Sequence, residues 1–359
     1  MKILIVKLSA IGDVIHTLPA VNALRRHDPH AHITWLVEED AAPLVMGHRA
    51  VDRVLVSKRK RWLRALAGPG RKAALQEMGA FIRALRDTRY DLVLDFQALL
   101  KSGVLIALAR GRRKVGFGRG MQHMEHSYIF LNEKIPPVSM EIHALERGLL
   151  LIEALGVARG EIAYDLPIDE SAREAAAVLL ARGGIHPDRP LVAVNPVAKW
   201  ETKLWPPGRF AALADGLVRR CGVQIVFTGS AADRPLVARI LAAMAAPALN
   251  LAGRTTLKTL AALYQRCDLL VTTDTGPMHL GCAAGLPVVA IFGPTAPWRT
   301  GPFGRGHTVV RRKLACSPCF KRICPLGTGA CLRGLPVQPV FAAVRRRLAD
   351  KCALGQTSP

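Results

Sequence analysis

The sequence predicts an α/β protein with two Rossmann-like domains, each built on a parallel sheet. Short apolar runs alternate with longer segments of helical periodicity, which is typical of parallel strands joined by crossover helices. The alternation pauses near residue 165 and begins again near residue 191, so the chain contains two such series. Its 359 residues, half of them hydrophobic, are enough for two domain cores.

The first series predicts five strands. "KILIVKL" (2–8) is an almost continuous apolar run, as expected for a strand buried on both faces. "DVIHTLPAVNALRRH" (13–27) predicts the helix that follows it. The other predicted strands of this series are 32–37, 51–57, 91–95 and 113–117, and its other helices are 73–87, 98–110 and 142–155.

The second series follows a polar, proline-bearing segment at 164–171 and a helix that ends near 183. Its predicted strands are 191–195, 223–229, 268–274 and 287–293, and its helices are 207–219, 231–245, 256–266 and 337–350. We therefore expect domains at 1–170 and 171–335, followed by a C-terminal helix and tail at 336–359.

Charge restricts the partners. Fifty Lys and Arg against 27 Asp and Glu give a formal net charge of +23, which favours nucleic acid, an acidic membrane surface or a phosphorylated substrate. The segment "SKRKRWLRALAGPGRK" (57–72) is either a solvated loop and helix start or a patch that docks on anionic lipid headgroups. The first apolar run is too short for a signal peptide and no stretch is long enough to span a bilayer, so we expect a cytoplasmic protein with reduced cysteines.

The turn after the first strand carries polar residues where open sheets bind ligands, beyond the carboxyl ends of their strands. "SAIGDVIHTLP" contains Ser9, Gly12 and Asp13. It has no G-x-G-x-x-G, which disfavours a dinucleotide site. Asp13 is either a helix N-terminal residue, stabilised by the helix dipole by about 0.3–1 kcal/mol, or a catalytic base.

A second strand-to-helix turn is "TTDTGPMHLGCAAGLP" (272–287). The strand ends at Asp274, and Thr275 and Gly276 precede a proline suited to the first helical position. Exposed N–H groups and the helix dipole there favour an anion such as a diphosphate. His279, one turn into the helix, is either a donor to a phosphate oxygen or a core-facing histidine.

Two further segments belong to the same predicted edge. "TGSAADR" places Ser230 and Asp233 near a helix start, and "NPVAKWETKLWP" brings Lys199 and Lys203 to the end of the first strand of the second domain. A lysine there can neutralise a phosphate charge, although solvated surface lysines are the alternative.

These segments together resemble glycosyltransferase family nine, the bacterial heptosyltransferases of lipopolysaccharide core assembly. The resemblance covers nearly the whole chain, and the opening is more similar to heptosyltransferase I than to the second enzyme. It implies a GT-B fold, in which two Rossmann-like domains with parallel sheets face each other across a cleft and the last helix often packs back on the first domain. The motifs that carry it are "MKILIVKLSAIGDVIHTLPA", "DFQALLKSG", "HALERGL", "KLWP", "TTDTGPMHLGCAAGLP" and "PTAPWRTGPFG".

The resemblance implies a function: inverting transfer of L-glycero-D-manno-heptose from ADP-heptose to Kdo on lipid A, at the cytoplasmic face of the inner membrane. The second domain would bind the donor and the first the acceptor, with no cofactor required. Asp13 would be the general base, and Lys203 with the amides of Thr275 and Gly276 would meet the diphosphate charge.

Lys101, His143 and Arg147 match family positions expected to face the acceptor, and Ser9 and Gly12 are expected on the same side. Arg112, Arg113 and Arg119 are near candidates in a loop that could close over the sugar. The alternative for Arg147 is a surface pair with Glu146 in the same helix.

The chain departs from the family just before "KLWP". Many members carry hydroxyl residues where this sequence has Ala198 and Lys199, and Thr202 or Thr228 would have to substitute. The alternatives are therefore another nucleotide sugar or the second-heptose acceptor within the same family. A basic nucleic-acid-binding protein and a dinucleotide oxidoreductase are disfavoured, because aromatic residues are few and neither motif is present.

Four of the eight cysteines cluster with the spacing C-x2-C-x4-C-x6-C: Cys316, Cys319, Cys324 and Cys331. Four thiolates are a donor set for a structural zinc or iron–sulfur site, but the spacing lacks the paired form of zinc ribbons. The sequence leaves open a metal site or a metal-free loop. Cys221, Cys267 and Cys282 lie in strand or helix contexts and are expected in the core.

Overall fold

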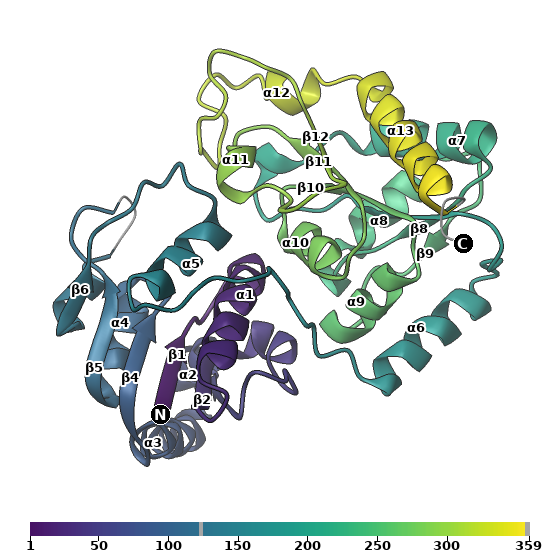
Figure 1. The fold of residues 1–359 in the computed structure, drawn as a ribbon. Coiled ribbons are helices and arrows are strands. Elements are labelled where there is room, and N and C mark those ends of the chain that lie inside the picture. The colour runs from purple at the N-terminus through teal and green to yellow at the C-terminus, as the bar shows by residue number, and fades with distance from the viewer. Residues whose placement is uncertain (122–124, 356–359) are drawn as a thin grey trace. The chain divides into compact units, whose positions relative to one another are not determined.

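A computed structural model describes residues 1–121 and 125–355, with side chains to residue 350. Contacts divide the chain into two compact units, Met1–Pro167 and Ile168–Pro359. Each unit is a sheet covered by helices (Figure 1). Residues 356–359 of the predicted tail lie outside the described residues.

Unit 1 is a six-stranded parallel sheet with the order β3-β2-β1-β4-β5-β6. It confirms all five predicted strands and adds a sixth of three residues, too short to show as an apolar run. The strands are β1 (Lys2–Val6), β2 (His32–Glu38), β3 (Arg53–Ser57), β4 (Arg89–Asp95), β5 (Arg110–Phe117) and β6 (Glu133–Ile135). The helices are α1 (Ile11–His27), α2 (Arg59–Leu66), α3 (Arg71–Arg86), α4 (Leu100–Leu108) and α5 (Ala144–Glu153), with 3-10 turns at Glu39–Leu44 and Ser127–Phe130.

The apolar sequence of β1 suits its place near the middle of this sheet. Ile3, Leu4, Ile5 and Val6 have no exposed surface, so both faces of the strand are covered. The register sets Ile5 opposite Trp35 on one side and Leu94 on the other. The fixed end of β1 therefore gives the residues after it a rigid starting point.

Helix α1 begins at Ile11, two residues before the prediction. Asp13 is consequently its third residue, and its carboxylate Oδ2 accepts a hydrogen bond from the Ala10 amide at 3.0 Å. The sequence hid this start because Ala10 has no side chain that caps a helix, so the reciprocal bond from Asp13 performs that role.

Unit 2 is also a six-stranded parallel sheet, with the order β12-β11-β10-β7-β8-β9. All four predicted strands are confirmed, and two short edge strands are added. The strands are β7 (Leu191–Asn195), β8 (Gln224–Phe227), β9 (Leu249–Asn250), β10 (Leu269–Thr273), β11 (Val288–Phe292) and β12 (Thr308–Arg311). The helices are α6 (Glu170–Arg182), α7 (Pro207–Cys221), α8 (Arg234–Ala242), α9 (Leu257–Gln265), α10 (Gly276–Ala283), α11 (Pro297–Thr300), α12 (Ala330–Arg333) and α13 (Val337–Gly355), with 3-10 turns at Glu201–Lys203 and Ala231–Asp233.

The core of unit 2 joins its last helix to its sheet. Helix α13 contacts α7 and the strands β10, β11 and β12. Trp205 is 1% exposed, packs edge-to-face on Phe210 with ring centroids 4.9 Å apart, and donates from Nε1 to the Leu335 carbonyl at 2.9 Å. This packing fixes the segment after β7, from which Lys203 projects.

Both sheets have one topological switch point. The chain adds β2 and β3 on one side of β1 and β4, β5 and β6 on the other; unit 2 adds β8 and β9 on one side of β7 and β10, β11 and β12 on the other. Ligands of open α/β sheets bind beyond the carboxyl ends of the strands at such points. The expected sites are therefore the loops after β1 and β4 and those after β7 and β10.

Candidate active site

The switch point of unit 1 contains a cavity of about 260 Å³. Its walls come from the segment after β1, the segment after β4 and the first turns of α1 and α5. The residues that carry ionisable groups there are Lys7, Asp13, His16 and Arg147. The structure thus brings two predicted site residues, Asp13 and Arg147, to one cavity.

Asp13 is held by its own helix. One carboxylate oxygen caps the Ala10 amide, and the backbone oxygen of Asp13 accepts from the Thr17 hydroxyl at 2.9 Å. The side chain is half-buried, and Gly12 beside it is buried. No described residue donates a hydrogen bond to Oδ1, so this oxygen is available to a ligand hydroxyl.

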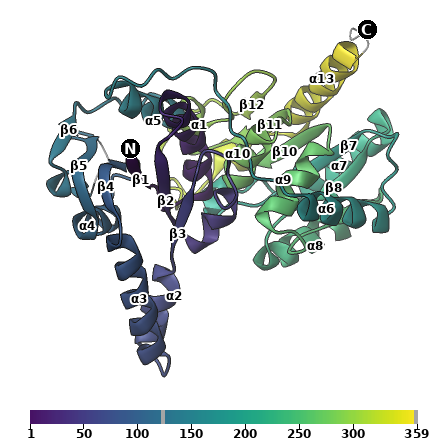
Figure 2. The same cartoon turned by 60° about the horizontal axis from the view of Figure 1, so that its bottom comes forward.

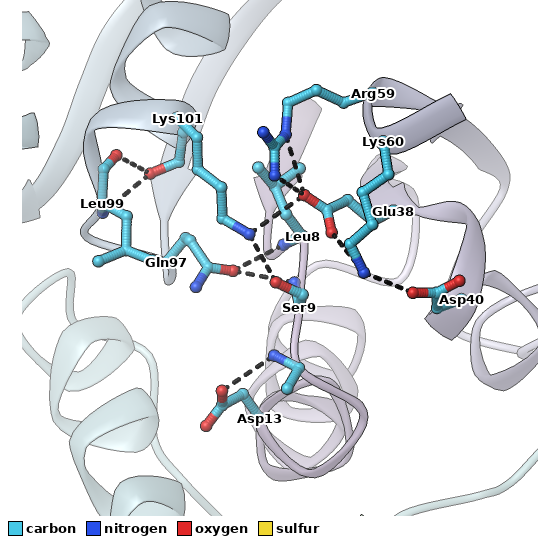
Figure 3. Close-up of polar contacts among 12 residues, drawn as sticks. Leu8, Ser9, Asp13, Glu38, Asp40, Arg59, Lys60, Gln97, Leu99 and Lys101 are labelled. Carbon is cyan, nitrogen blue, oxygen red and sulfur yellow. Dashed lines mark hydrogen bonds and ion pairs between the residues drawn. The ribbon is translucent and has the colours of Figure 1, made fainter. Parts of the chain in front are cut away.

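Ser9 and Lys101 belong to a neighbouring polar cluster (Figure 3). Lys101 Nζ lies 2.6 Å from Ser9 Oγ and 3.1 Å from Oε1 of Glu38, whose side chain is only 4% exposed. Gln97 Oε1 accepts from the Leu8 and Ser9 amides at 2.9 and 3.0 Å. The cluster ties the ends of β1, β2 and β4 together.

The basic segment predicted at 57–72 contributes to this cluster. Arg59 and Lys60 of α2 reach Glu38 at 3.3 and 3.8 Å, and Lys60 also pairs with Asp40 at 2.6 Å. Trp62, which interrupts the basic residues of this segment, is buried and donates to Glu77 of α3 at 2.9 Å. Its ring contacts that of Phe81 of α3, with centroids 5.3 Å apart. Helices α2 and α3 pack on each other as a hairpin (Figure 2).

Two other predicted residues lie on α5. His143 is the N-cap of this helix, where its Nδ1 accepts from the Leu145 amide at 3.2 Å, and its ring stands 5.1 Å from that of His16. The Arg147 guanidinium contacts the Met140 sulfur at the cavity wall. An edge-to-face contact between the two histidine rings thus connects α5 to α1, the helix that carries Asp13.

The three predicted loop arginines do not line the cavity, and the loop prediction is wrong for Arg112 and Arg113, which belong to strand β5. Arg119 is exposed. Arg112 is also exposed, and Arg113 pairs with Glu133 at 2.7 Å, an ion pair that raises the pKa of Arg113 and lowers that of Glu133. A role for Arg119 at the acceptor stays a prediction.

At the switch point of unit 2, Lys203 and Asp274 form a buried ion pair. Lys203 Nζ lies 2.6 Å from Asp274 Oδ2, and these side chains are 16% and 7% exposed. The Thr295 hydroxyl donates to the same carboxylate at 2.6 Å, and the ammonium stands 4.5 Å from the centre of the Trp200 ring. Two residues predicted for the donor site therefore meet directly.

The N-terminus of α10 lies beside this pair. Thr275 is its N-cap, with no side-chain hydrogen bond, and Gly276 and Pro277 form its first positions. The first amides of a helix have no intrahelical acceptor, so they point at whatever occupies the site. His279, one turn in, is 7% exposed.

The remaining predicted donor residues have other partners or are exposed. Ser230 and Asp233 bond each other: the Ser230 amide donates to Asp233 Oδ2 at 2.7 Å. Lys199 is exposed. The substitute hydroxyls are engaged by protein groups, since Thr202 donates to the Lys321 carbonyl at 2.8 Å and the fully buried Thr228 accepts from Asn195 at 3.0 Å.

The cysteine cluster does not form a metal site in the described residues. No group of three or more His, Cys, Asp or Glu side chains in the described residues is placed to hold an ion. Cys316 is exposed, while Cys319, Cys324 and Cys331 are partly buried. The metal interpretation of the spacing is therefore not supported. Cys267 and Cys282 are buried as expected, whereas Cys221 is partly exposed.

Sequence reasoning missed Lys7, Glu38, Gln97 and Thr295. Lys7 had a visible signal, because it is a lysine within an apolar run, six residues before Asp13. Its ammonium donates to the Phe96 carbonyl at 2.9 Å, and burial lowers its pKa, with Asp13 and Asp95 acting in the opposite direction. The partners of Glu38 are distant in sequence, so no local pattern indicated it.

Each unit is a parallel Rossmann-like sheet with polar groups at its switch point. Unit 1 has a carboxylate in a cavity that is also lined by cations, and unit 2 has a lysine beside a helix start without a side-chain cap. These are the features of a glycosyltransferase of GT-B type. A family model described as "Glycosyltransferase family 9 (heptosyltransferase)" matches residues 78–329. The chain belongs to this family.

Curated relatives are similar in sequence to most of the chain. Lipopolysaccharide heptosyltransferase 1 of Pseudomonas aeruginosa is 33% identical over 328 residues, covering 90% of this chain and 87% of that protein. The enzyme of the same name from Escherichia coli K12 is 30% identical, covering 87% and 93%.

Solved structures agree in fold. A family 9 glycosyltransferase of Veillonella parvula gives a TM-score of 0.84 at 25% identity, covering 97% of both chains. E. coli heptosyltransferase WaaC with ADP gives 0.76 at 27% identity, covering 97% of this chain and all of that one. WaaC with ADP-2-deoxy-2-fluoro heptose gives 0.72 at 26% identity, covering 98% and 100%.

Proposed function

We propose that the chain transfers L-glycero-D-manno-heptose from ADP-heptose to the Kdo–lipid A inner core, with inversion at the donor carbon. Unit 2 binds the donor and unit 1 the acceptor. The observation that carries this proposal is the pairing of chemistries at the two switch points: Asp13 in a cationic cavity in unit 1, and Lys203 beside the α10 N-terminus in unit 2. The names of the relatives, and the ADP-heptose analogue bound to WaaC, support the choice of donor.

In the proposed mechanism, Asp13 removes the proton of the attacking acceptor hydroxyl through Oδ1. The hydroxyl oxygen bonds to the heptose carbon from the side opposite the diphosphate, and the carbon–oxygen bond to ADP breaks. ADP leaves as an anion without needing a proton. Lys203 and the amides of Thr275 and Gly276 stabilise the charge that grows on the diphosphate.

The test compares donors and one variant. Transfer from ADP-heptose to Kdo2–lipid A should exceed transfer from UDP- and GDP-sugars to the same acceptor. Asp13→Asn should bind ADP-heptose normally but transfer about 10²–10⁴-fold more slowly. Asp28→Asn, at the opposite end of the same helix, is the matched control and should retain activity. Near-normal transfer by Asp13→Asn would exclude the base assignment, and a preferred UDP- or GDP-sugar would exclude the donor.

We also propose that the protein works on an anionic membrane surface at the cytoplasmic face of the inner membrane. No helix among the described residues combines the length and apolarity that crossing a bilayer requires. The support lies in the α2–α3 hairpin, where the cations Arg64, Arg71 and Lys72 are exposed together with Leu63 and Leu75. Exposed cations beside apolar side chains suit the interface of an anionic bilayer.

A further inference from the structure

Lys7 is a cation whose hydrogen-bonding capacity is mostly unused. It follows β1 directly and lines the same cavity as Asp13. An ammonium has three N–H donors, and one N–H of Lys7 donates to the Phe96 carbonyl. It forms no ion pair with any described residue. Two donors therefore remain for whatever enters the cavity.

The cavity as a whole carries excess positive charge. Two cations, Lys7 and Arg147, line it. Asp95 also acts on Lys7 electrostatically, but it does not line the cavity. Asp13 is the one carboxylate among the described lining residues. An unpaired cation in a desolvated place is costly, and the lowered pKa of Lys7 reflects that cost. A bound anion would remove it.

The position of Lys7 is rigid. Its amide donates to the Leu36 carbonyl at 3.2 Å, which continues the pairing of β1 with β2, and its ammonium is fixed to the segment after β4. A charge held on the sheet in this way is preorganised for one ligand geometry, unlike a lysine on a mobile loop.

We propose that Lys7, together with Arg147, forms a subsite for the carboxylate of an acidic sugar, so that the enzyme selects an acceptor whose attacking ring carries that carboxylate. This inference rests on the proposed function. The cavity, about 260 Å³, holds both Lys7 and Asp13, so the anion and the attacking hydroxyl belong to a single ring. A guanidinium fork and an ammonium together match the two oxygens of a carboxylate.

Calorimetric titration with two small ligands tests the subsite without any transfer reaction. The ligands are the methyl glycoside of Kdo and its analogue in which the acid is reduced to a primary alcohol. The wild-type protein should bind the acid about 10- to 100-fold more tightly than the alcohol, as expected for hydrogen bonds to a charged group. Lys7→Gln keeps a donor for the Phe96 carbonyl but loses the charge, and should bind both ligands about equally weakly.

Lys114→Met is the matched control, since the Lys114 ammonium also donates to a backbone carbonyl, that of Ala107, and does not line the cavity. It should keep the wild-type preference. Lys7→Met repeats the test if Lys7→Gln does not fold, and the thermal midpoint of each variant reports folding. A wild-type protein that does not distinguish acid from alcohol, or a folded Lys7 variant that still does, would overturn the subsite.

The transfer assay separates this inference from the function on which it rests. With Kdo2–lipid A and its carboxyl-reduced form as acceptors, Lys7→Gln should lose rate on the acid form and change little on the reduced form. If the wild-type protein binds the acid selectively but transfers no heptose, the proposed function fails and the subsite stands. If heptose transfer is normal and the Lys7 variants keep the acid preference, the subsite fails and the function stands.

Discussion

The buried pair of Lys203 and Asp274 has two roles that can be separated. Within unit 2 it neutralises a carboxylate that is 7% exposed and that also accepts from Thr295. Removing one partner of a buried pair strands the other charge, at a cost of about 3–5 kcal/mol. In the proposed reaction the same ammonium meets the diphosphate, so stability and donor affinity both depend on it.

We predict that Lys203→Met lowers both the free energy of unfolding and the affinity for ADP-heptose. The double variant Lys203→Met/Asp274→Asn should recover part of the stability, because no carboxylate is left unpaired, but should not recover donor affinity. Urea unfolding and calorimetric titration measure the two effects. Lys313→Met, an exposed lysine of the same unit, is the control; an equal loss of donor affinity there, or recovery of affinity in the double variant, would contradict the assignment.

The sequence indicated candidate site residues where the signal is local. Asp13 and Asp274 each follow a strand and enter a helix, and both lie at a switch point. Glu38 could not be predicted in this way, because its partner Lys101 is 63 residues away and only the folded sheet brings them together. The spacing of the cysteines left a metal site and a metal-free loop open, because spacing does not give the geometry of the four thiols; the described residues do not support the metal site.

At the level of elements, apolar run length decided what could be predicted. The nine strands that the sequence predicted have four or more residues each, whereas β6 has three and β9 has two. Strand β12 has four residues, but only the two valines of "TVVR" are apolar, so no apolar run marks it in the sequence. The α2 helix was hidden in the sequence because its basic residues are typical of a charged loop, and Trp62 is the one buried residue of this helix.

Helix α6 offers a test of capping with a defined pH dependence. Its N-cap Asp169 accepts from the Ala172 amide at 2.9 Å and pairs with Lys258 at 2.8 Å, which lowers its pKa from 3.8 to about 2. The bond to Lys258 is the largest cause. An acid whose pKa is lower in the folded state than in the unfolded state stabilises the fold at pH values above its unfolded-state pKa. This stabilisation is lost as the pH falls through the folded-state pKa.

We therefore predict that Asp169→Ala lowers the urea midpoint at neutral pH, and that its difference from wild type shrinks as pH falls from about 4 toward about 2. Denaturation curves at several pH values measure this difference. Glu174→Ala, which removes an exposed acid from the interior of the same helix, should cause a smaller change with little pH dependence. A difference that stays constant with pH would show that the charge of Asp169 is unimportant.

For the molecule as a whole, charge distribution matters more than total charge. The formal net charge is +23, but several cations of the basic segment are engaged, since Arg59, Lys60 and Arg61 pair with Glu38, Asp40 and Glu77. Those left exposed lie on the α2–α3 hairpin that extends from the sheet of unit 1 (Figure 2). Local concentration of charge, rather than its sum, should determine membrane binding.

We predict that replacing Arg64, Arg71 and Lys72 by serine weakens binding to vesicles rich in anionic lipid by about 100-fold, at about 1 kcal/mol per cation near the surface. Binding of the wild-type protein should fall as salt is raised. Vesicle sedimentation measures both. The control removes the same charge from exposed sites of unit 2: Arg182, Arg219 and Arg239. An equal loss in the control would mean that net charge alone drives binding.

The brevity of the outer strands has a consequence for behaviour at high concentration. Strands β6, β9 and β12, which border three of the four open sides of the sheets, contain three, two and four residues. Each has few unpaired backbone N–H and C=O groups, so a strand of a neighbouring molecule can form few hydrogen bonds with it. If the protein gathers on a membrane surface as proposed above, its short edge strands let it reach a high local concentration there without forming intermolecular sheets.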